Sequence, residues 1–286
     1  MFVFKNHFLI SISIPHIFGP FSATWAIQIF YIDDPKSQSV FGMNINPNLE
    51  RLKQNHDRII FTALPSDLVS KFGSRKKLLY WTNEWVWQNV VAENVLVFTG
   101  NSVICSNGRI SLLDGSANRE LFDHVDYVGA PWMNMYGEGG DAGAISFRKR
   151  SAMIDAIKFK PYETKDGRDD SYFIKTLKAL NKKNEELGTK KRYNIATKDQ
   201  THIFGGNLNN FSSNHGPPPL PMVISGTMAN LNHDVRQDIL NSCPELGMIF
   251  PLLHHPSCFG ANPDGEECGK HICALKPASE RSTHGC

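Results

Sequence analysis

Two adjacent carboxylates, Asp169 and Asp170, are the residues of this chain whose chemistry is easiest to state. A carboxylate within hydrogen-bond reach of a hydroxyl group can act as a general base. Acidic residues are also favoured in the first turn of a helix, where they cap backbone N–H groups and complement the helix dipole. The sequence therefore offers a catalytic interpretation and a capping interpretation of this pair.

A polar turn at residues 100–102 is a second candidate site. Its sequence, GNS, follows the apolar run VLVFT at residues 95–99, which predicts a buried strand. Open α/β sheets bind ligands at the carboxyl ends of their strands, so a ligand would lie beside this turn. Hard oxygen ligands, above all carboxylates, suit Mg²⁺ and Mn²⁺. Because Asn101 and Ser102 offer only neutral oxygens, we expect any such ion to bind weakly.

The glycine loop GEGGDAG, residues 137–143, is a third candidate site. Glycine adopts positive φ at little cost and lets the backbone approach a ligand closely. The carboxylates of Glu138 and Asp141 could then bind hydroxyl groups of that ligand. A plain tight turn explains the glycines equally well, and the sequence leaves both interpretations open.

Alternating strand and helix patterns predict the fold that would position these residues. Short apolar runs indicate strands at residues 26–32, 58–64, 95–99, 126–131 and 143–147. Amphipathic spacing indicates helices at residues 74–91 and 169–188. This order is typical of an α/β fold with a mixed, mainly parallel sheet flanked by helices.

The predicted helix at residues 74–91 carries three tryptophans. Leu78, Trp81, Trp85 and Val86 fall on one helical face. Indole rings could form a stacking platform for a sugar, but the helical spacing favours packing in the core.

Composition excludes some classes of function. The 286 residues include 41% hydrophobic and 20% charged residues, which is ordinary for a globular protein with a sizeable core. A net charge of +2 gives no electrostatic case for nucleic-acid binding, and the basic cluster at residues 190–192 is interpreted as a solvated surface. No uncharged apolar run reaches about 18 residues, so we expect no transmembrane helix. Residues 1–18 are interpreted as the start of the fold, with a signal peptide as the alternative.

A loop-like stretch, GGNLNNFSSNHGPPPLP, begins at residue 205 and indicates a domain boundary. We therefore predict an α/β domain at residues 10–206 and an irregular, cysteine-rich extension at residues 207–286. Four of the six cysteines lie in the extension's last 29 residues: Cys258, Cys268, Cys273 and Cys286. Their spacing lacks the paired knuckles of a zinc site, so disulfides are expected to staple the tail. Disulfides would indicate an oxidising compartment such as the secretory pathway (the Golgi lumen), rather than the cytoplasm.

Four motifs in a fixed order carry a resemblance to a known family. They are VLVFTGNSVICSNG, DHVDYVGAPW, GGDAGAISFRKRSAM and RDDSYF. Together they resemble the glycosyltransferase-like family of domains of unknown function numbered 5672, which is common in fungi. The resemblance covers roughly residues 10–180. It implies a nucleotide-diphospho-sugar transferase fold of the GT-A type.

The resemblance also implies roles for individual residues. Asp170 or Asp169 would be the catalytic base, and Asn101 stands where the family carries a metal-binding aspartate for Mn²⁺ or Mg²⁺. The donor-binding residues would be Thr99, Gly100, Asn101, Ser102, Gly139, Gly140, Asp141 and Gly143.

Two hypotheses of function follow. In the first, the protein transfers a sugar from a nucleotide-sugar donor to a glycan or other hydroxyl acceptor. In the second, it is a catalytically inactive binding protein with the same fold. Asn101 favours the second hypothesis, as does the lack of a counterpart to the family's first donor-binding strand at residues 1–13. Asp141 and Asp170 favour the first.

Overall fold

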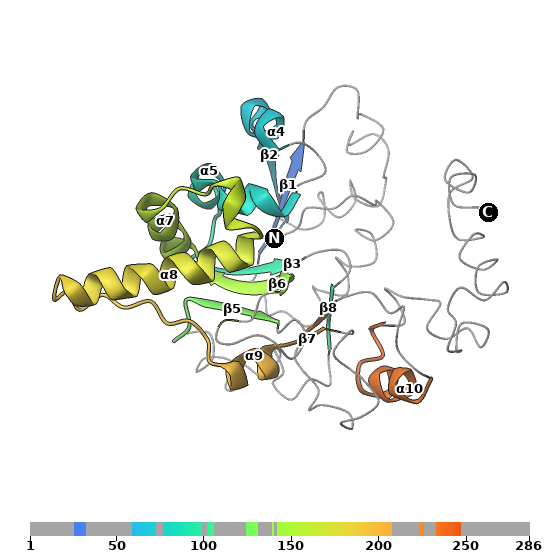
Figure 1. The fold of residues 1–286 in the computed structure, drawn as a ribbon. Helices are drawn as coiled ribbons and strands as arrows, with labels where there is room; N and C mark the ends of the chain where they lie inside the picture. Colours follow the sequence, from blue (N-terminus) through green and yellow to red (C-terminus); the bar gives the residue numbers. More distant parts are fainter. Residues whose placement is uncertain are drawn as a thin grey trace.

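A computed structural model describes nine parts of the chain (Figure 1). These are residues 26–32, 59–72, 77–98, 102–105, 124–130, 139, 142–207, 223–225 and 233–246. They form a mixed α/β structure, as the sequence predicts. None of the helices within these residues combines the length and the apolar character that crossing a membrane requires.

The described strands form three sets of hydrogen-bonded neighbours. β1 (Ile27–Ile32) pairs in parallel with β2 (Ile59–Leu64). β6 (Ala142–Lys149) lies antiparallel between β3 (Asn94–Phe98) and β5 (Tyr127–Ala130). In the third set, β8 (Val223–Ser225) lies antiparallel to β4 (Ser102–Ile104) and parallel to β7 (Gly205–Asn207).

The predicted predominance of parallel strands is not confirmed. Three of the five strand pairs within the described residues are antiparallel. Residues 131–141 alone connect β5 to β6, and parallel neighbours need a crossover of about a dozen residues or more. The short connection therefore turns the chain back beside itself, and β6 runs against both of its neighbours.

The helices of the central part lie close to β6. The principal ones are α7 (Arg150–Phe159) and α8 (Asp169–Glu186), which pack against each other and against β6. α9 (Lys198–Phe204) contacts β5 and β7 instead. Two further helices are α4 (Ser66–Phe72) and α10 (His233–Ser242), and the short 3-10 helix η3 (Thr164–Asp166) precedes α8.

The tryptophan-rich helix predicted at residues 74–91 is two shorter helices. The 3-10 helix η2 (Lys77–Thr82) ends before α5 (Glu84–Gln88) begins. Asn83 lies between them with extended backbone angles, and its side chain accepts a hydrogen bond from the Trp85 backbone N–H at 2.9 Å. An asparagine that caps a helix in this way starts a new helix and cannot continue the previous one.

The tryptophans belong to the hydrophobic core, as their spacing predicts. Trp81 and Trp87 are almost fully buried, and the Trp87 Nε1–H donates to the Trp81 carbonyl oxygen at 2.5 Å. Trp85 packs against the same cluster from its edge. Phe173, on the buried face of α8, meets the Trp87 ring edge to face at 6.1 Å between centroids. The stacking-platform alternative therefore does not hold for Trp81 and Trp87.

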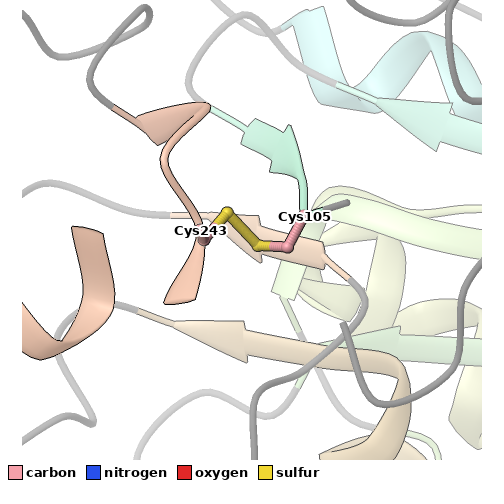
Figure 2. Close-up of a disulfide and its surroundings, with 2 residues drawn as sticks. All are labelled: Cys105 and Cys243. Carbon is pink, nitrogen blue, oxygen red and sulfur yellow. A yellow bond between two sulfur atoms is a disulfide. The ribbon is translucent and has the colours of Figure 1, made fainter. Parts of the chain in front are cut away.

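A disulfide ties the central part of the chain to its C-terminal part. Cys105, directly after β4, is bonded to Cys243, directly after α10 (Figure 2). The two residues are 138 positions apart in the sequence, and their Cα atoms lie 4.9 Å apart. The four tail cysteines lie outside the described residues, so their predicted disulfides stay a prediction.

Contacts also cross the predicted domain boundary at residues 206–207. This boundary falls inside β7, and β8 from the predicted extension pairs with β4 from the predicted α/β domain. At least residues 223–225 and 243 are thus joined to the α/β domain. The division itself stays a prediction.

Candidate functional site

The N-terminus of α8 presents the two predicted carboxylates. Before the helix, Glu163 and Asp166 form a reciprocal capping box around η3, and Gly167 follows with a φ of 81°. This turn directs the chain into α8, whose first two residues are Asp169 and Asp170. The predicted helix start is confirmed, and both carboxylates lie where a helix dipole stabilises negative charge.

Asp169 is committed to an ion pair inside the protein. The Arg148 Nη2 atom donates to Asp169 Oδ2 at 2.7 Å, and both side chains are fully buried. Arg148 comes from β6, and its Nε–H donates to Ser146 Oγ at 2.8 Å. One donor and one acceptor of the pair, Arg148 Nη1 and Asp169 Oδ1, are buried without a hydrogen-bond partner among the protein atoms.

Aromatic rings enclose this ion pair. The Arg148 guanidinium lies 5.4 Å from the centre of the Tyr127 ring and 5.3 Å from that of Phe173. Burial raises the pKa of Asp169 above its ordinary value, although the positive charge of Arg148 opposes that shift. Burial lowers the pKa of Arg148, but the attraction of Asp169 outweighs this and leaves the pKa raised. The surroundings therefore penalise charge, and the pair persists because each partner compensates the other.

Asp170 has a different environment from its neighbour. Its carboxylate is also fully buried, but Oδ2 accepts a hydrogen bond from Arg168 Nη2 at 2.8 Å, and the Arg168 side chain is 40% exposed. Oδ1 accepts from the backbone N–H of Ser171 at 2.6 Å. Asp170 is thus covered by an arginine that reaches solvent, whereas Asp169 is locked to an interior arginine.

Gly139 packs closely between β5 and α8. Its φ is 92°, its N–H donates to the Ala196 carbonyl at 2.6 Å, and its carbonyl accepts from Gly129 N–H at 2.7 Å. A Cβ atom at this position would come within 2.9 Å of Ile174 and Ile195 side-chain atoms. Both the backbone angle and the space require glycine here. For Gly139, packing is a sufficient explanation.

The remaining predicted site residues are only partly described. Ser102 is not in a turn: it is the buried first residue of β4 and lies opposite Ser225 of β8. Ser102 therefore belongs to β4 and not to the turn predicted at residues 100–102, because its pairing with β8 makes it part of the strand. Gly143 lies within β6. The following predicted site residues lie outside the described residues: Thr99, Gly100, Asn101, Gly140 and Asp141.

Described residues of the three candidate segments lie at different positions along the β5–β6 pair. Arg148 of β6 lies opposite Tyr127 of β5, and Gly129, two residues further, holds Gly139. At the far end of β5, Ala130 lies against Gly205 of β7, in the same sheet as β4. A strand rises about 3.3 Å per residue, so residues 127 and 130 are about 10 Å apart. The carboxylates and β4 thus lie at opposite ends of this pair.

The predicted metal ligands fit Mg²⁺ or Mn²⁺ poorly. Asn101 and Ser102 supply an amide and a hydroxyl oxygen, and Ser102 is fully buried. Within the described parts of the chain, no three His, Cys, Asp or Glu side chains gather in a way that could hold a metal ion. Neutral ligands alone do not compensate a hard divalent cation, so these two residues would hold such an ion only weakly.

Arg148 is a site residue to which the sequence assigned no role. It lies on a strand whose residues 145–148 are all buried. Arginine is almost never fully buried unless it is paired. An arginine inside such an apolar strand is therefore a signal for a buried carboxylate partner, and the acidic pair Asp169–Asp170 is a candidate for that partner.

Comparisons with known proteins found a family and a distantly similar structure. The family model described as "Protein of unknown function (DUF5672)" matches residues 58–220. A crystal structure of the glycosyltransferase GlyE from Streptococcus pneumoniae TIGR4 is similar with a TM-score of 0.43 and 11% identity. The similarity covers 88% of this chain and 59% of GlyE, so the chain spans less than two thirds of that protein. The search of curated proteins found no match.

Proposed function

The chain belongs to the DUF5672 family, and from this premise we propose that it is a glycosyltransferase acting on a nucleotide-sugar donor and a hydroxyl acceptor. The observation that carries the proposal is the arrangement at the start of α8. Two adjacent carboxylates are held there, one fixed by Arg148 and the other covered by a partly exposed arginine. The motif resemblance to glycosyltransferase-like domains supports the same assignment.

The two carboxylates would have separate roles. Asp169 balances the charge of Arg148 and thereby fixes the first turn of α8 against β6. Asp170 would be the base, because its arginine partner is partly exposed and thereby connects the buried carboxylate to solvent. An acceptor hydroxyl would replace Arg168 at the Asp170 carboxylate, within hydrogen-bond reach.

The transfer itself needs one proton acceptor and one stabilised leaving group. Asp170 would take the hydroxyl proton while the acceptor oxygen forms a bond to the anomeric carbon of the sugar. The bond from that carbon to the diphosphate would break, and the nucleoside diphosphate would leave with the bonding electrons. The turn at residues 99–102 and the loop at residues 139–143 would contact the donor, with backbone N–H groups compensating the developing charge.

A catalytically inactive binding protein is the second candidate. The burial of both carboxylates, each already paired, favours it, as does Asn101 in place of a metal-binding aspartate. Because the predicted ligands are neutral, we expect Mn²⁺ or Mg²⁺ to strengthen donor binding only slightly.

A thermal-shift screen of nucleotide sugars, with and without Mn²⁺, tests the proposal. A donor at about 100 times its dissociation constant should stabilise the fold by roughly 2.7 kcal/mol. Release of nucleoside diphosphate, together with a shift, supports a transferase. A shift without release supports the binding protein. No shift with any donor contradicts both candidates.

The disulfide supports a further part of the proposal, an oxidising compartment such as the secretory pathway. Cys105 and Cys243 are both buried and bonded, and such bonds are rare in reducing compartments. Thiol counting on denatured, non-reduced protein from its native source measures this directly. Six free thiols would contradict the assignment.

A further inference from the structure

Residues 175–186 of α8 and the segment after them form a basic surface, here named the basic arm. Its basic side chains are all exposed: Lys175, Lys178, Lys182, Lys183, Lys190, Lys191 and Arg192. The acidic side chains on or beside it are Asp155, Glu185 and Glu186. Seven basic and three acidic groups leave a formal excess of four positive charges, whereas the whole chain has a net charge of +2. The positive charge of this protein is therefore concentrated here.

Helix geometry and hydrogen bonds join these charges into one surface. Lys175, Lys178 and Lys182 are three and four residues apart, which places them on one helical face, and buried residues such as Leu177 occupy the opposite face. The chain then folds back beside α8. The Asn181 side chain pairs with the Tyr193 backbone at 2.7 and 2.8 Å. Figure 1 shows this end of α8 projecting beyond α7, with the returning segment alongside.

Two of the lysines are held in place by the protein. The Lys183 ammonium lies 5.1 Å from the centre of the Phe159 ring. Lys191 donates to Asp155 at 2.6 Å and lies 5.3 Å from the centre of the Tyr193 ring. Ordering a long side chain costs conformational entropy. These contacts reduce that cost when the surface binds a partner.

The apolar group at the tip of the basic arm indicates the kind of partner. Leu187 ends α8 and is 64% exposed; within the described residues, Val91 is the other large hydrophobic side chain with such exposure. Leu187 follows Glu185 and Glu186 in the chain, with Lys183 four residues before it and Lys190 three residues after it. An exposed leucine on a surface with an excess of basic side chains matches an anionic bilayer surface, where cations meet headgroups and an apolar side chain enters the acyl boundary. Single-stranded nucleic acid would call for exposed aromatic rings, yet Tyr193 is buried. We infer that the basic arm docks this protein on membranes that contain anionic phospholipids.

Co-sedimentation with lipid vesicles tests this inference. Vesicles of phosphatidylcholine with about 30 mol% phosphatidylserine should bind the protein, and phosphatidylcholine alone should not. Binding should fall steeply between about 0.1 M and 0.5 M NaCl, because the charges are exposed and screened by salt. The triple variant Lys182→Glu, Lys190→Glu, Arg192→Glu should reduce partitioning by at least about tenfold. Leu187→Ser should reduce it by a smaller factor, about threefold.

A matched triple variant controls for net charge alone. Lys71→Glu, Lys165→Glu, Lys198→Glu makes the same charge change at exposed positions outside the basic arm. It should leave partitioning within about twofold of the unmodified protein, since the effect of a surface charge falls off within a Debye length. Circular dichroism verifies that each variant is folded. Equal loss in both triple variants, or equal binding to both kinds of vesicle, would overturn the inference. Binding to single-stranded RNA with none to the vesicles would overturn it as well.

Discussion

The two ends of α8 carry charge in opposite ways. At its N-terminus, Arg148 and Asp169 are fully buried and neutralise each other inside the protein. At its C-terminus, exposed lysines outnumber the carboxylates beside them, although Lys182 pairs with Glu186 and Lys191 with Asp155. The acidic residues at the N-terminus and the lysines at the C-terminus both complement the dipole of α8. Only the buried Asp169 at the N-terminus requires a charged partner from another element. The N-terminus is therefore an interior ion-pair site, and the C-terminus is a surface whose net positive charge faces solvent.

The largest effect on stability is expected from breaking the interior pair. Arg148→Met leaves the Asp169 carboxylate buried without a partner, and such a loss costs about 3–5 kcal/mol. Urea unfolding followed by tryptophan fluorescence measures this. Lys149→Met is the matched control on the same strand, because its pair with Asp126 is partly exposed and should be worth about 1 kcal/mol or less.

Replacing both partners of that pair gives a sharper comparison. The double variant Arg148→Met, Asp169→Met removes both charges and should be destabilised by less than the sum of its two single variants. Additive single losses would mean that Arg148 and Asp169 act independently. That result would contradict the assignment of the α8 N-terminus as one coupled site.

Loss of the disulfide is expected to cost about 2–5 kcal/mol. Cys105→Ala and Cys243→Ala should destabilise the protein equally, because either change opens the same bond between β4 and the segment after α10. Adding a reductant should destabilise the unmodified protein by more than it destabilises either variant. If the free energies of unfolding of the two variants differ by more than about 1 kcal/mol, local packing contributes more to their loss of stability than the disulfide does.

Gly139→Ala should cost about 2–3 kcal/mol, because it combines an unfavourable φ with overpacking. Gly167→Ala separates these causes, since Gly167 also has a positive φ, at 81°, but a Cβ there meets no atom within 4 Å. It should cost about 1 kcal/mol less than Gly139→Ala, because it adds backbone strain without overpacking. Thermal unfolding of both variants measures the difference. Equal losses would show that Ile174 and Ile195 move aside freely.

Alkaline pH should destabilise the core around α8. Burial raises the pKa of Tyr172 above its ordinary value of 10.0, so the folded protein keeps a proton that the unfolded chain releases. This stability is fully present below pH 10 and is lost as the pH rises further. Tyr172→Phe should make the free energy of unfolding fall less steeply with pH, by up to about 1.4 kcal/mol per pH unit. An unchanged slope in urea titrations from about pH 9 to 11 would contradict the assignment to Tyr172.

Local patterns predicted the elements well but not their pairing. The strand runs, the start of α8 and the burial of Trp81 and Trp87 follow from spacing within a few residues, which is what periodicity reports. The antiparallel pairing of β6 and the Cys105–Cys243 bond join residues far apart in sequence. Many partners are compatible with each of these residues, so the sequence could not select one.

The candidate site shows the same limit. The acidic pair was found because two carboxylates before an amphipathic stretch form a local signal. Their different environments depend on Arg148, 21 residues before Asp169, and on the partly exposed Arg168 beside Asp170. The basic arm was missed for a related reason. Residues 190–192 are a short cluster by themselves, and only the return of the chain beside α8 joins them to its lysines.

The central claim is that Asp170 is the base of a sugar transfer at the N-terminus of α8. Its most direct test is nucleoside diphosphate release from a donor found by the thermal-shift screen, comparing Asp170→Asn with Asp155→Asn. Asp155 is a carboxylate of α7 that likewise accepts hydrogen bonds from charged and polar side chains, but at the basic arm. Asp170→Asn should still bind the donor and release product at least about 100-fold more slowly, while Asp155→Asn keeps the unmodified rate. Release by Asp170→Asn at that same rate would contradict the claim.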